Sequence, residues 1–183
     1  MKKSLLFGLG LSLTLSGVSF AQEKSDEEAA QSDSIATINW LNPKDYADVR
    51  AANESRSRFS KRVFNRLDEY FNELAEELPE GHTIDITVND LDLAGQVWPA
   101  QFVGLGHSTG DVRLIKRVDI PRIKFSYVLK NNGNVVKEAE VNLKDMGFLD
   151  RLAGRYKSDP LRYEKRMLND WFSDEFSEQI AKN

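Results

Sequence analysis

The sequence of 183 residues contains no cysteine and only two histidines. Disulfide bonds and a cysteine-linked lipid anchor are therefore excluded, and an ordinary hydrophobic core has to hold the fold. Neither His82 nor His107 has a second histidine at ligand spacing, so a zinc site is not supported. A nucleophile elbow is also missing, which leaves His107, Asp111 and Ser108 as a weak triad fragment.

The chain also lacks a basic surplus. Its 25 lysines and arginines face 29 acidic residues, and the formal net charge is -4. A general nucleic-acid binder needs excess positive charge to neutralise phosphates, so the composition argues against that class. A hydrophobic content of 40% with 10% aromatic residues excludes a wholly disordered, a collagen-like or a polytopic membrane chain.

The amino-terminal residues have the pattern of a secretory signal peptide. Lys2 and Lys3 precede an apolar run over residues 5–18, and small residues occupy the positions before a cleavage site after Ala21. The run is shorter than the roughly 20 apolar residues of a membrane span. We therefore expect residues 1–21 to be removed, leaving no transmembrane anchor, and the protein to be periplasmic in a bacterium.

The mature chain is expected to have two parts. Residues 22–33 contain five acids, one lysine and no large apolar side chain, which indicates a solvated, disordered tether; a functional acidic tail is the alternative. Residues 34–183 have the size of one domain with a single core.

The first half of this domain predicts a strand, a long helix and a second strand. Apolar and polar residues alternate over 35–41 and 84–88, as in half-buried strands. Between them, over about 53–78, apolar residues recur at three- and four-residue spacing, which is typical of one stripe of an amphipathic helix. Such a crossover predicts that the two strands are parallel if they share one sheet.

The second half predicts a hairpin and a final helix. Residues 91–119 are rich in glycine and are expected to form a long irregular loop. Strands are expected over 123–129 and 135–143, joined by a tight turn at Asn132 and Gly133, with Val135 on the apolar face. The last helix is expected over 160–180.

Asp159 is expected to be the N-cap of this last helix, with Pro160 at its first position. The element order is then β-α-β-β-β-α. Because every strand has one apolar and one polar face, the sequence predicts an α+β fold. Its architecture is a two-layer sandwich, with a four-stranded mixed sheet and two helices on one face.

Two carboxylates lie close together before a glycine, at Asp90 and Asp92. Oxygen ligands of this kind suit a hard divalent cation. The calcium-loop pattern is incomplete because Ala94 stands at the next ligand position and no glutamate closes the loop. A turn at the end of a strand is the alternative interpretation.

Charge is distributed unevenly along the domain. Residues 67–112 contain ten acids and no lysine or arginine, whereas residues 113–166 contain fourteen basic residues and seven acids. Basic residues also crowd the first half of the long helix, against the preference of the helix dipole. Either these segments pair across the fold, or they form a surface that docks a partner protein or an anionic envelope component.

A cluster of basic and aromatic residues surrounds the start of the last helix. A helix N-terminus attracts anions, and arginine and tyrosine are enriched at binding hot spots. The predicted interaction residues are Arg151, Arg155, Tyr156, Asp159, Arg162, Tyr163 and Arg166. A structural role, with Asp159 as a cap and the tyrosines packed, is the alternative.

Part of this cluster lies in the segment 158–168, which together with residues 170–172 resembles a known family signature. Segments 42–46, 92–95 and 121–123 are also similar to its pattern. The family is a bacterial domain of unknown function, number three-zero-one-six, of predicted secreted proteins. The resemblance implies a single exported domain and supplies no catalytic residue.

No convincing catalytic constellation is present in the sequence, and no cofactor is expected. We interpret the chain as a non-enzymatic binding or accessory module of the bacterial envelope. The alternative is a small-ligand or divalent-metal-binding protein, or an enzyme, that uses residues 90–119.

Overall fold

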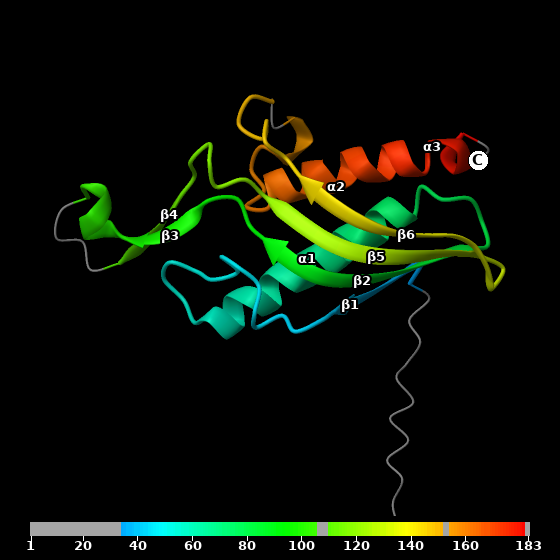
Figure 1. Cartoon of the computed structure of the whole chain (residues 1–183), viewed down its shortest axis with the longest axis horizontal. Coiled ribbons are helices and arrows are strands. Elements are labelled where there is room, and N and C mark those ends of the chain that lie inside the picture. Colours follow the sequence, from blue (N-terminus) through cyan, green and yellow to red (C-terminus); the bar gives the residue numbers. More distant parts are fainter. Residues whose placement is uncertain (1–33, 106–109, 152–153, 182–183) are drawn as a thin grey trace, which may run out of the picture. The chain divides into compact units, whose positions relative to one another are not determined.

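The computed structural model describes residues 34–105, 110–151 and 154–181 (Figure 1), all within the unit Asp33–Asn183. The predicted signal peptide at 1–21 and tether at 22–33 lie outside the described residues, as do His107 and Ser108. The division of the chain into these three parts therefore stays a prediction.

Four strands form one mixed sheet in the order β1-β2-β5-β6. They are β1 (Ala36–Trp40), β2 (His82–Asp92), β5 (Arg122–Asn131) and β6 (Asn134–Lys144). Strands β1 and β2 pair parallel because a helix connects them, and the other pairs are antiparallel. The predicted α+β fold, with a four-stranded mixed sheet, is confirmed.

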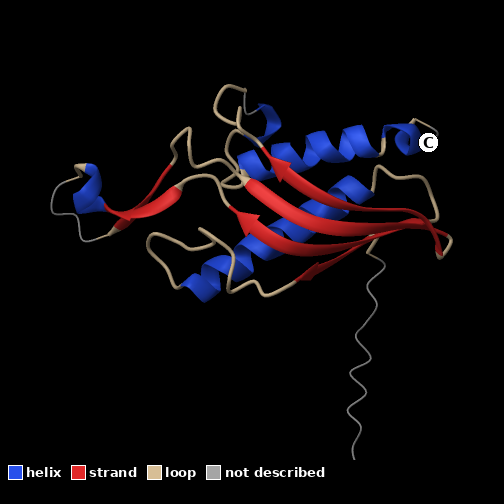
Figure 2. Ribbon diagram, in the orientation of Figure 1, coloured by secondary structure: helices blue, strands red, loops and turns tan. Residues whose placement is uncertain are grey.

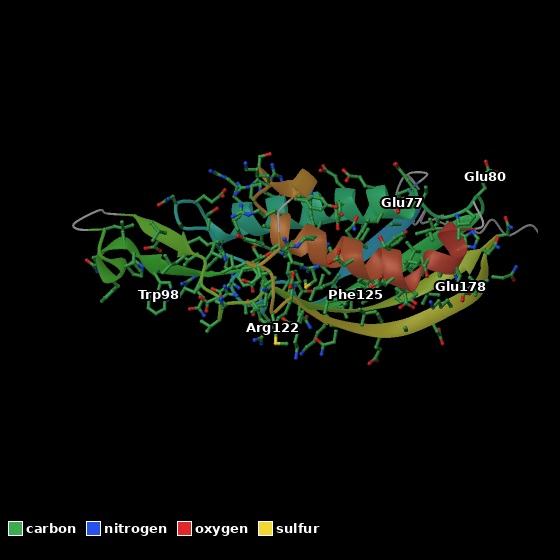
Figure 3. The ribbon with its side chains drawn as sticks, turned by 90° about the horizontal axis from the view of Figure 1, so that it is seen from above. Glu77, Glu80, Trp98, Arg122, Phe125 and Glu178 are labelled. Atoms are coloured by element: carbon green, nitrogen blue, oxygen red, sulfur yellow. The ribbon has the colours of Figure 1, made fainter. Side chains whose placement is uncertain are left out.

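Helices cover one face of this sheet (Figure 3). The long helices are α1 (Arg56–Ala75) and α2 (Arg162–Glu175), and a short helix, α3 (Ser177–Ile180), follows the second. Ser55 caps α1 by accepting a hydrogen bond from the backbone N–H of Arg58 at 3.4 Å. No described helix combines the length and the apolar character that crossing a membrane requires.

The core lies between the helices and the inner face of the sheet. Phe125 of β5 contacts the rings of Trp171 and Phe71, with centroid distances of 4.7 and 6.1 Å. Tyr127, two residues further, is 1% exposed, and its hydroxyl donates to Glu175 Oε1 at 2.6 Å. The alternation in 123–129 therefore directs its apolar side chains toward both helices, as the pattern predicts.

The outer face of the sheet pairs acidic β2 with basic β5. Lys130 Nζ lies 2.6 Å from Asp85 Oδ2, and Asp92 stands opposite Arg122 in the strand register. Charges that are far apart in sequence are thus neighbours in space. On this face, the structure supports the interpretation that acidic and basic segments pair across the fold.

The predicted irregular loop at 91–119 contains a second, two-stranded sheet, so this prediction was wrong in part (Figure 2). Its elements are β3 (Gln96–Pro99), the 3-10 helix η1 (Ala100–Val103) and β4 (Asp111–Leu114). Strands of four residues are too short to show a clear period of two. Gly95 starts the segment with a φ of 78°, a conformation that favours glycine.

The predicted start of the last helix was also wrong. The helix α2 begins at Arg162, with Leu161 as its N-cap, instead of beginning at Pro160. Asp159 forms a turn before the helix, in which its Oδ1 accepts from the backbone N–H of Leu161 at 2.7 Å. The helix is then interrupted at Phe176, which separates α2 from α3.

One further residue departs from the sequence pattern. Val135, predicted on the apolar face, is 57% exposed. It lies next to the Asn132 turn, where the pairing of β5 with β6 shifts between Leu129 and Lys130. At the end of a hairpin, alternation alone does not guarantee a covering layer.

Candidate functional site

The predicted interaction cluster separates into three groups in the structure. In the first group, Arg151 and Arg166 both bind Asp145, with Nη2 to Oδ2 distances of 2.6 and 3.4 Å. Arg166 also donates to the carbonyl oxygen of Phe148 at 2.6 Å, and Arg151 also pairs with Asp170. Arg166 is 8% and Asp145 7% exposed, so these side chains hold the segment after β6 against α2.

The second group stabilises the approach to α2. The Tyr156 hydroxyl, in the 3-10 helix η2 (Gly154–Tyr156), lies 2.6 Å from the hydroxyl of Tyr70. Asp159 Oδ2 pairs with Lys165 Nζ at 2.9 Å. The side chain of Arg155 is not among those described. Tyr156 and Asp159 therefore have structural contacts that do not require a partner molecule.

The third group, Arg162 and Tyr163, lines a cavity of about 280 Å³. The cavity lies where α1, the end of β2, the end of β4 and the start of α2 meet. Its walls combine apolar side chains with four arginines and one acid. The lining residues are Phe59, Arg62, Val63, Arg66, Leu93, Ala94, Arg113, Ile115, Pro160, Leu161, Arg162, Tyr163 and Glu164.

Arg113 of β4 is a structural member of this lining. Its guanidinium donates to four backbone carbonyl oxygens, those of Asp48, Arg50, Ala94 and Gly95, at 2.6, 2.8, 3.2 and 2.8 Å. Burial lowers the pKa of Arg113. These contacts tie residues 48–50 to the turn after β2 and fix one wall of the cavity.

The other arginines keep more of their donors available. Arg62 is half exposed and pairs with Glu54. Arg162 stacks on Tyr163, with Cζ 4.5 Å from the ring centroid, and donates from Nη2 to the Tyr163 hydroxyl at 3.1 Å. Arg66 acts electrostatically on Asp159, where it helps to lower the pKa of that carboxyl. Arg66 on α1 and Arg162 on α2 thus line one cavity from two helices.

Glu164 is the only acid among the described residues that line the cavity. It is 3% exposed, and its Oε1 accepts from the backbone N–H of Ala94 at 2.8 Å. Its Oε2 is buried and has no hydrogen-bond partner among the described residues. Burial raises the pKa of Glu164, although the backbone N–H groups of Ala94 and of Glu164 itself and the charges of Arg113 and Arg162 oppose the rise.

The start of α2 adds to the positive potential. Residues 161–164, from the N-cap to the third helical position, all line the cavity. The N-cap, Leu161, has no side-chain oxygen to satisfy the first-turn N–H groups. The positive end of the helix dipole therefore points toward a space that also holds Arg66 and Arg162.

The divalent-cation alternative at Asp90 and Asp92 has weaker geometry. Within 34–105, 110–151 and 154–181, no group of three or more acidic or histidine side chains could hold a metal ion. Burial and the carboxylates of Asp48 and Asp90 raise the pKa of Asp92, and Arg122 and Arg113 oppose this. His82, the histidine that the structure describes, has Nδ1 2.9 Å from the carbonyl oxygen of Pro79.

The cavity residues Arg62, Arg66, Arg113 and Glu164 were not among the predicted interaction residues. One signal for the first two was present: basic residues crowd the start of the long helix, where the helix dipole disfavours them. Such a placement lowers local helix stability, so another contact has to favour it. The tertiary contact that brings this half of α1 beside α2 could not be read from spacing.

The fold and the cavity define a small α+β domain with one helix-covered mixed sheet and an arginine-lined cavity beside its helices. Residues 34–174 match the family described as "Protein of unknown function (DUF3016)". The match covers more than half of the chain, so the protein belongs to this family, and the resemblance seen in the sequence is confirmed. No curated protein and no solved structure matches the chain.

Proposed function

We propose that this protein is an exported, non-enzymatic module of the bacterial envelope that binds a small organic anion in the arginine-lined cavity. One observation carries the proposal. Arg66 and Arg162, from two different helices, line the same cavity as Glu164, whose buried Oε2 has no partner among the described residues. Buried polar atoms are nearly always hydrogen-bonded, and a ligand whose polar head reaches Oε2 would supply the missing partner.

The volume and the lining residues of the cavity indicate which class of ligand it can bind. A volume of 280 Å³ lies just below the range of about 300–1,000 Å³ that is usual for drug-sized ligands. Phe59, Leu93 and Leu161 provide apolar contacts, whereas Arg66 and Arg162 suit a carboxylate, sulfonate or phosphate group. The expected ligand therefore has one anionic head and a short apolar body.

Binding is favoured over catalysis by the composition of the lining. The described lining residues include no serine, threonine, cysteine, lysine or histidine, and they include a single carboxyl group. Nucleophilic catalysis and paired acid-base catalysis both need such groups within hydrogen-bond reach of each other. The arrangement can hold and orient an anion without changing it.

The cavity also favours the small-ligand form of the hypothesis over a flat docking surface. Leu93, Ala94, Arg113 and Ile115 come from the segment 90–119, which was the alternative ligand site, and Arg162 and Tyr163 come from the predicted interaction cluster. Parts of both hypotheses made from the sequence therefore meet at this cavity, whereas Arg151, Tyr156, Asp159 and Arg166 are not among its lining residues. The predicted role of Arg151 and Arg166 in docking stays untested, and both already have acidic partners.

A ligand titration tests the proposal. Benzenesulfonate, benzoate and phenyl phosphate are expected to raise the melting temperature of the mature protein, because a ligand of the folded state stabilises it. The double variant Arg66→Gln/Arg162→Gln is expected to lower affinity by at least about tenfold, since each charge-assisted hydrogen bond contributes roughly 1.5–3 kcal/mol. Isothermal titration calorimetry measures this loss.

The double variant Arg58→Gln/Lys61→Gln is the matched control. It removes the same charge from exposed positions of the same helix, and neither residue lines the cavity. We expect the control to bind the probes as the wild type does. An equal loss of affinity in both double variants, or no stabilisation by any of the three anions, would contradict the proposal.

Export is tested separately. Cell fractionation is expected to find the protein in the periplasm, and intact mass measurement is expected to show a chain that begins at Gln22, because the signal pattern ends at Ala21. A full-length chain retained in the cytoplasm would contradict this part of the proposal.

A further inference from the structure

Glu164 raises a question that anion binding alone does not answer. A negatively charged carboxylate is a poor neighbour for a bound anion, yet Glu164 lies in the wall of the cavity that Arg66 and Arg162 share. Its Oε1 is already engaged by the Ala94 N–H, so Oε2 is the oxygen without a described partner. In the neutral acid, a proton on Oε2 becomes a hydrogen-bond donor to the ligand.

We infer that Glu164 enters the complex as a neutral carboxylic acid and donates a hydrogen bond from Oε2 to the anionic head of the ligand. The inference rests on the proposed function and adds that pH regulates binding at the same site. The bound anion and the proton on Glu164 then stabilise each other. Affinity is therefore highest at low pH and falls as Glu164 ionises.

The charged and polar groups that line the cavity with Glu164 support this assignment. From α1 come Arg62 and Arg66, from β4 comes Arg113, and α2 itself adds Arg162 and the hydroxyl of Tyr163. Arginine stays charged at all accessible pH values. The residues contributed by the end of β2 and by the turn before α2 carry no charge: Leu93, Ala94, Pro160 and Leu161.

Other carboxylates near the cavity interact with basic groups, and Asp159, which precedes the lining residue Pro160, pairs with Lys165 at 2.9 Å. Glu54 pairs with Arg62, which lowers the pKa of Glu54. Asp48 and Asp92 act on Arg113, the same arginine that attracts the carboxylate of Glu164. Burial of Glu164 outweighs these attractions and raises its pKa, which favours the neutral donor. Among the described lining residues, Glu164 is therefore the group whose ionisation can switch binding.

Proton linkage has a measurable signature with benzenesulfonate, a probe that keeps its charge throughout. From about pH 5 to pH 9, the wild-type affinity is expected to be constant at first and then to fall by about tenfold per pH unit above the pKa of Glu164. In that upper range, calorimetry in two buffers of different ionisation enthalpy is expected to detect uptake of one proton for each anion bound.

Glu164→Gln is the decisive variant. Its side-chain oxygen can still accept from the Ala94 N–H, and its amide N–H can donate to the anion without titrating. We expect this variant to bind benzenesulfonate at every pH with the affinity that the wild type has at low pH. Its binding is expected to take up no proton. Glu164→Leu, which removes the donor, is expected to bind at least about tenfold more weakly at low pH.

Stability provides a second readout that needs no ligand. A carboxyl whose pKa is raised in the folded state favours folding below its ordinary pKa, and this contribution is lost as pH rises through the raised value. The unfolding midpoint of Glu164→Gln is therefore expected to gain on the wild type as pH rises. Equal pH dependence of the two proteins would overturn the neutral state.

The outcomes separate this inference from the proposed function. Failure of every probe to bind contradicts anion binding itself. Binding by the wild type that strengthens with pH or does not depend on it overturns only the role of Glu164. The same holds if Glu164→Gln binds as weakly at low pH as Glu164→Leu, because a donor at this position would then contribute nothing to binding.

Discussion

Replacing Asp145 with alanine is expected to lower the free energy of unfolding by about 3–5 kcal/mol, the usual cost of removing one partner of a buried ion pair. Asp145 is 7% exposed and holds both Arg151 and Arg166. Without it, Arg166, itself 8% exposed, keeps its charge in a buried position, where the carbonyl oxygens of Phe148 and Arg151 accept from it but do not neutralise it.

Urea unfolding measures this loss as a lower midpoint with an unchanged slope. Asp150→Ala is the matched control, because Asp150 pairs with Arg117 on the exposed surface. We expect the control to leave the midpoint where it is. If Asp145→Ala and Asp150→Ala unfold at the same urea concentration, Asp145 does not hold the segment after β6 in place.

Replacing Arg113 with methionine is expected to lower the free energy of unfolding by about 2–4 kcal/mol. The change removes charge-assisted hydrogen bonds of roughly 1.5–3 kcal/mol each, and hydrogen bonds from water to the freed carbonyl oxygens offset part of this loss. Four carbonyl oxygens share this guanidinium, two in residues 48–50 and two in residues 94–95. Methionine preserves much of the apolar length that packs near Phe59.

The loss is expected to be local as well as global. Hydrogen exchange should accelerate in residues 48–50 and 94–95 before it accelerates in the core strand β5, because Arg113 ties these two segments together. Arg117→Met is the control, since Arg117 lies on the exposed surface. A variant Arg113→Met with wild-type exchange in both segments would show that the four hydrogen bonds do not hold this wall of the cavity.

The main sheet and the long helices could be predicted because their patterns are long. The alternation that places Phe125 and Tyr127 against the helices extends over a whole strand, and α1 carries its apolar stripe for twenty residues. The turn at Asn132 and Gly133 is also local, because both residues adopt positive φ there. Each of these features is determined by neighbours in the sequence.

The hairpin of β3 and β4 and the start of α2 could not be predicted, for two different reasons. Each strand of the hairpin has four residues, so its pairing rests on the partner strand. At the start of α2, Asp159 and Pro160 satisfy the local rules for a helix start, but the Asp159 side chain bonds to Leu161 and pairs with Lys165 instead. At that position a local Asx turn competes with the N-cap, so two local rules disagree and the sequence alone does not decide between them.

The same distinction applies to the candidate site. Arg162 and Tyr163 were predicted because they belong to a dense local cluster, whereas Arg66 and Arg113 reach the cavity from elements far away in sequence. Arg166 was predicted as a docking residue on its charge alone. It is buried against Asp145 because the segment after β6 lies beside α2, a contact between residues that are far apart in sequence.

The most direct test is a crystal structure of the mature protein grown with para-bromobenzenesulfonate. The anomalous signal of the bromine gives the position of the probe without fitting the probe to the electron density. We expect the sulfonate oxygens within hydrogen-bond distance of Arg66, Arg162 and Glu164 Oε2, with the ring against Phe59 and Leu161. A probe bound only at exposed arginines such as Arg58, with the cavity unfilled, would contradict the proposed anion site.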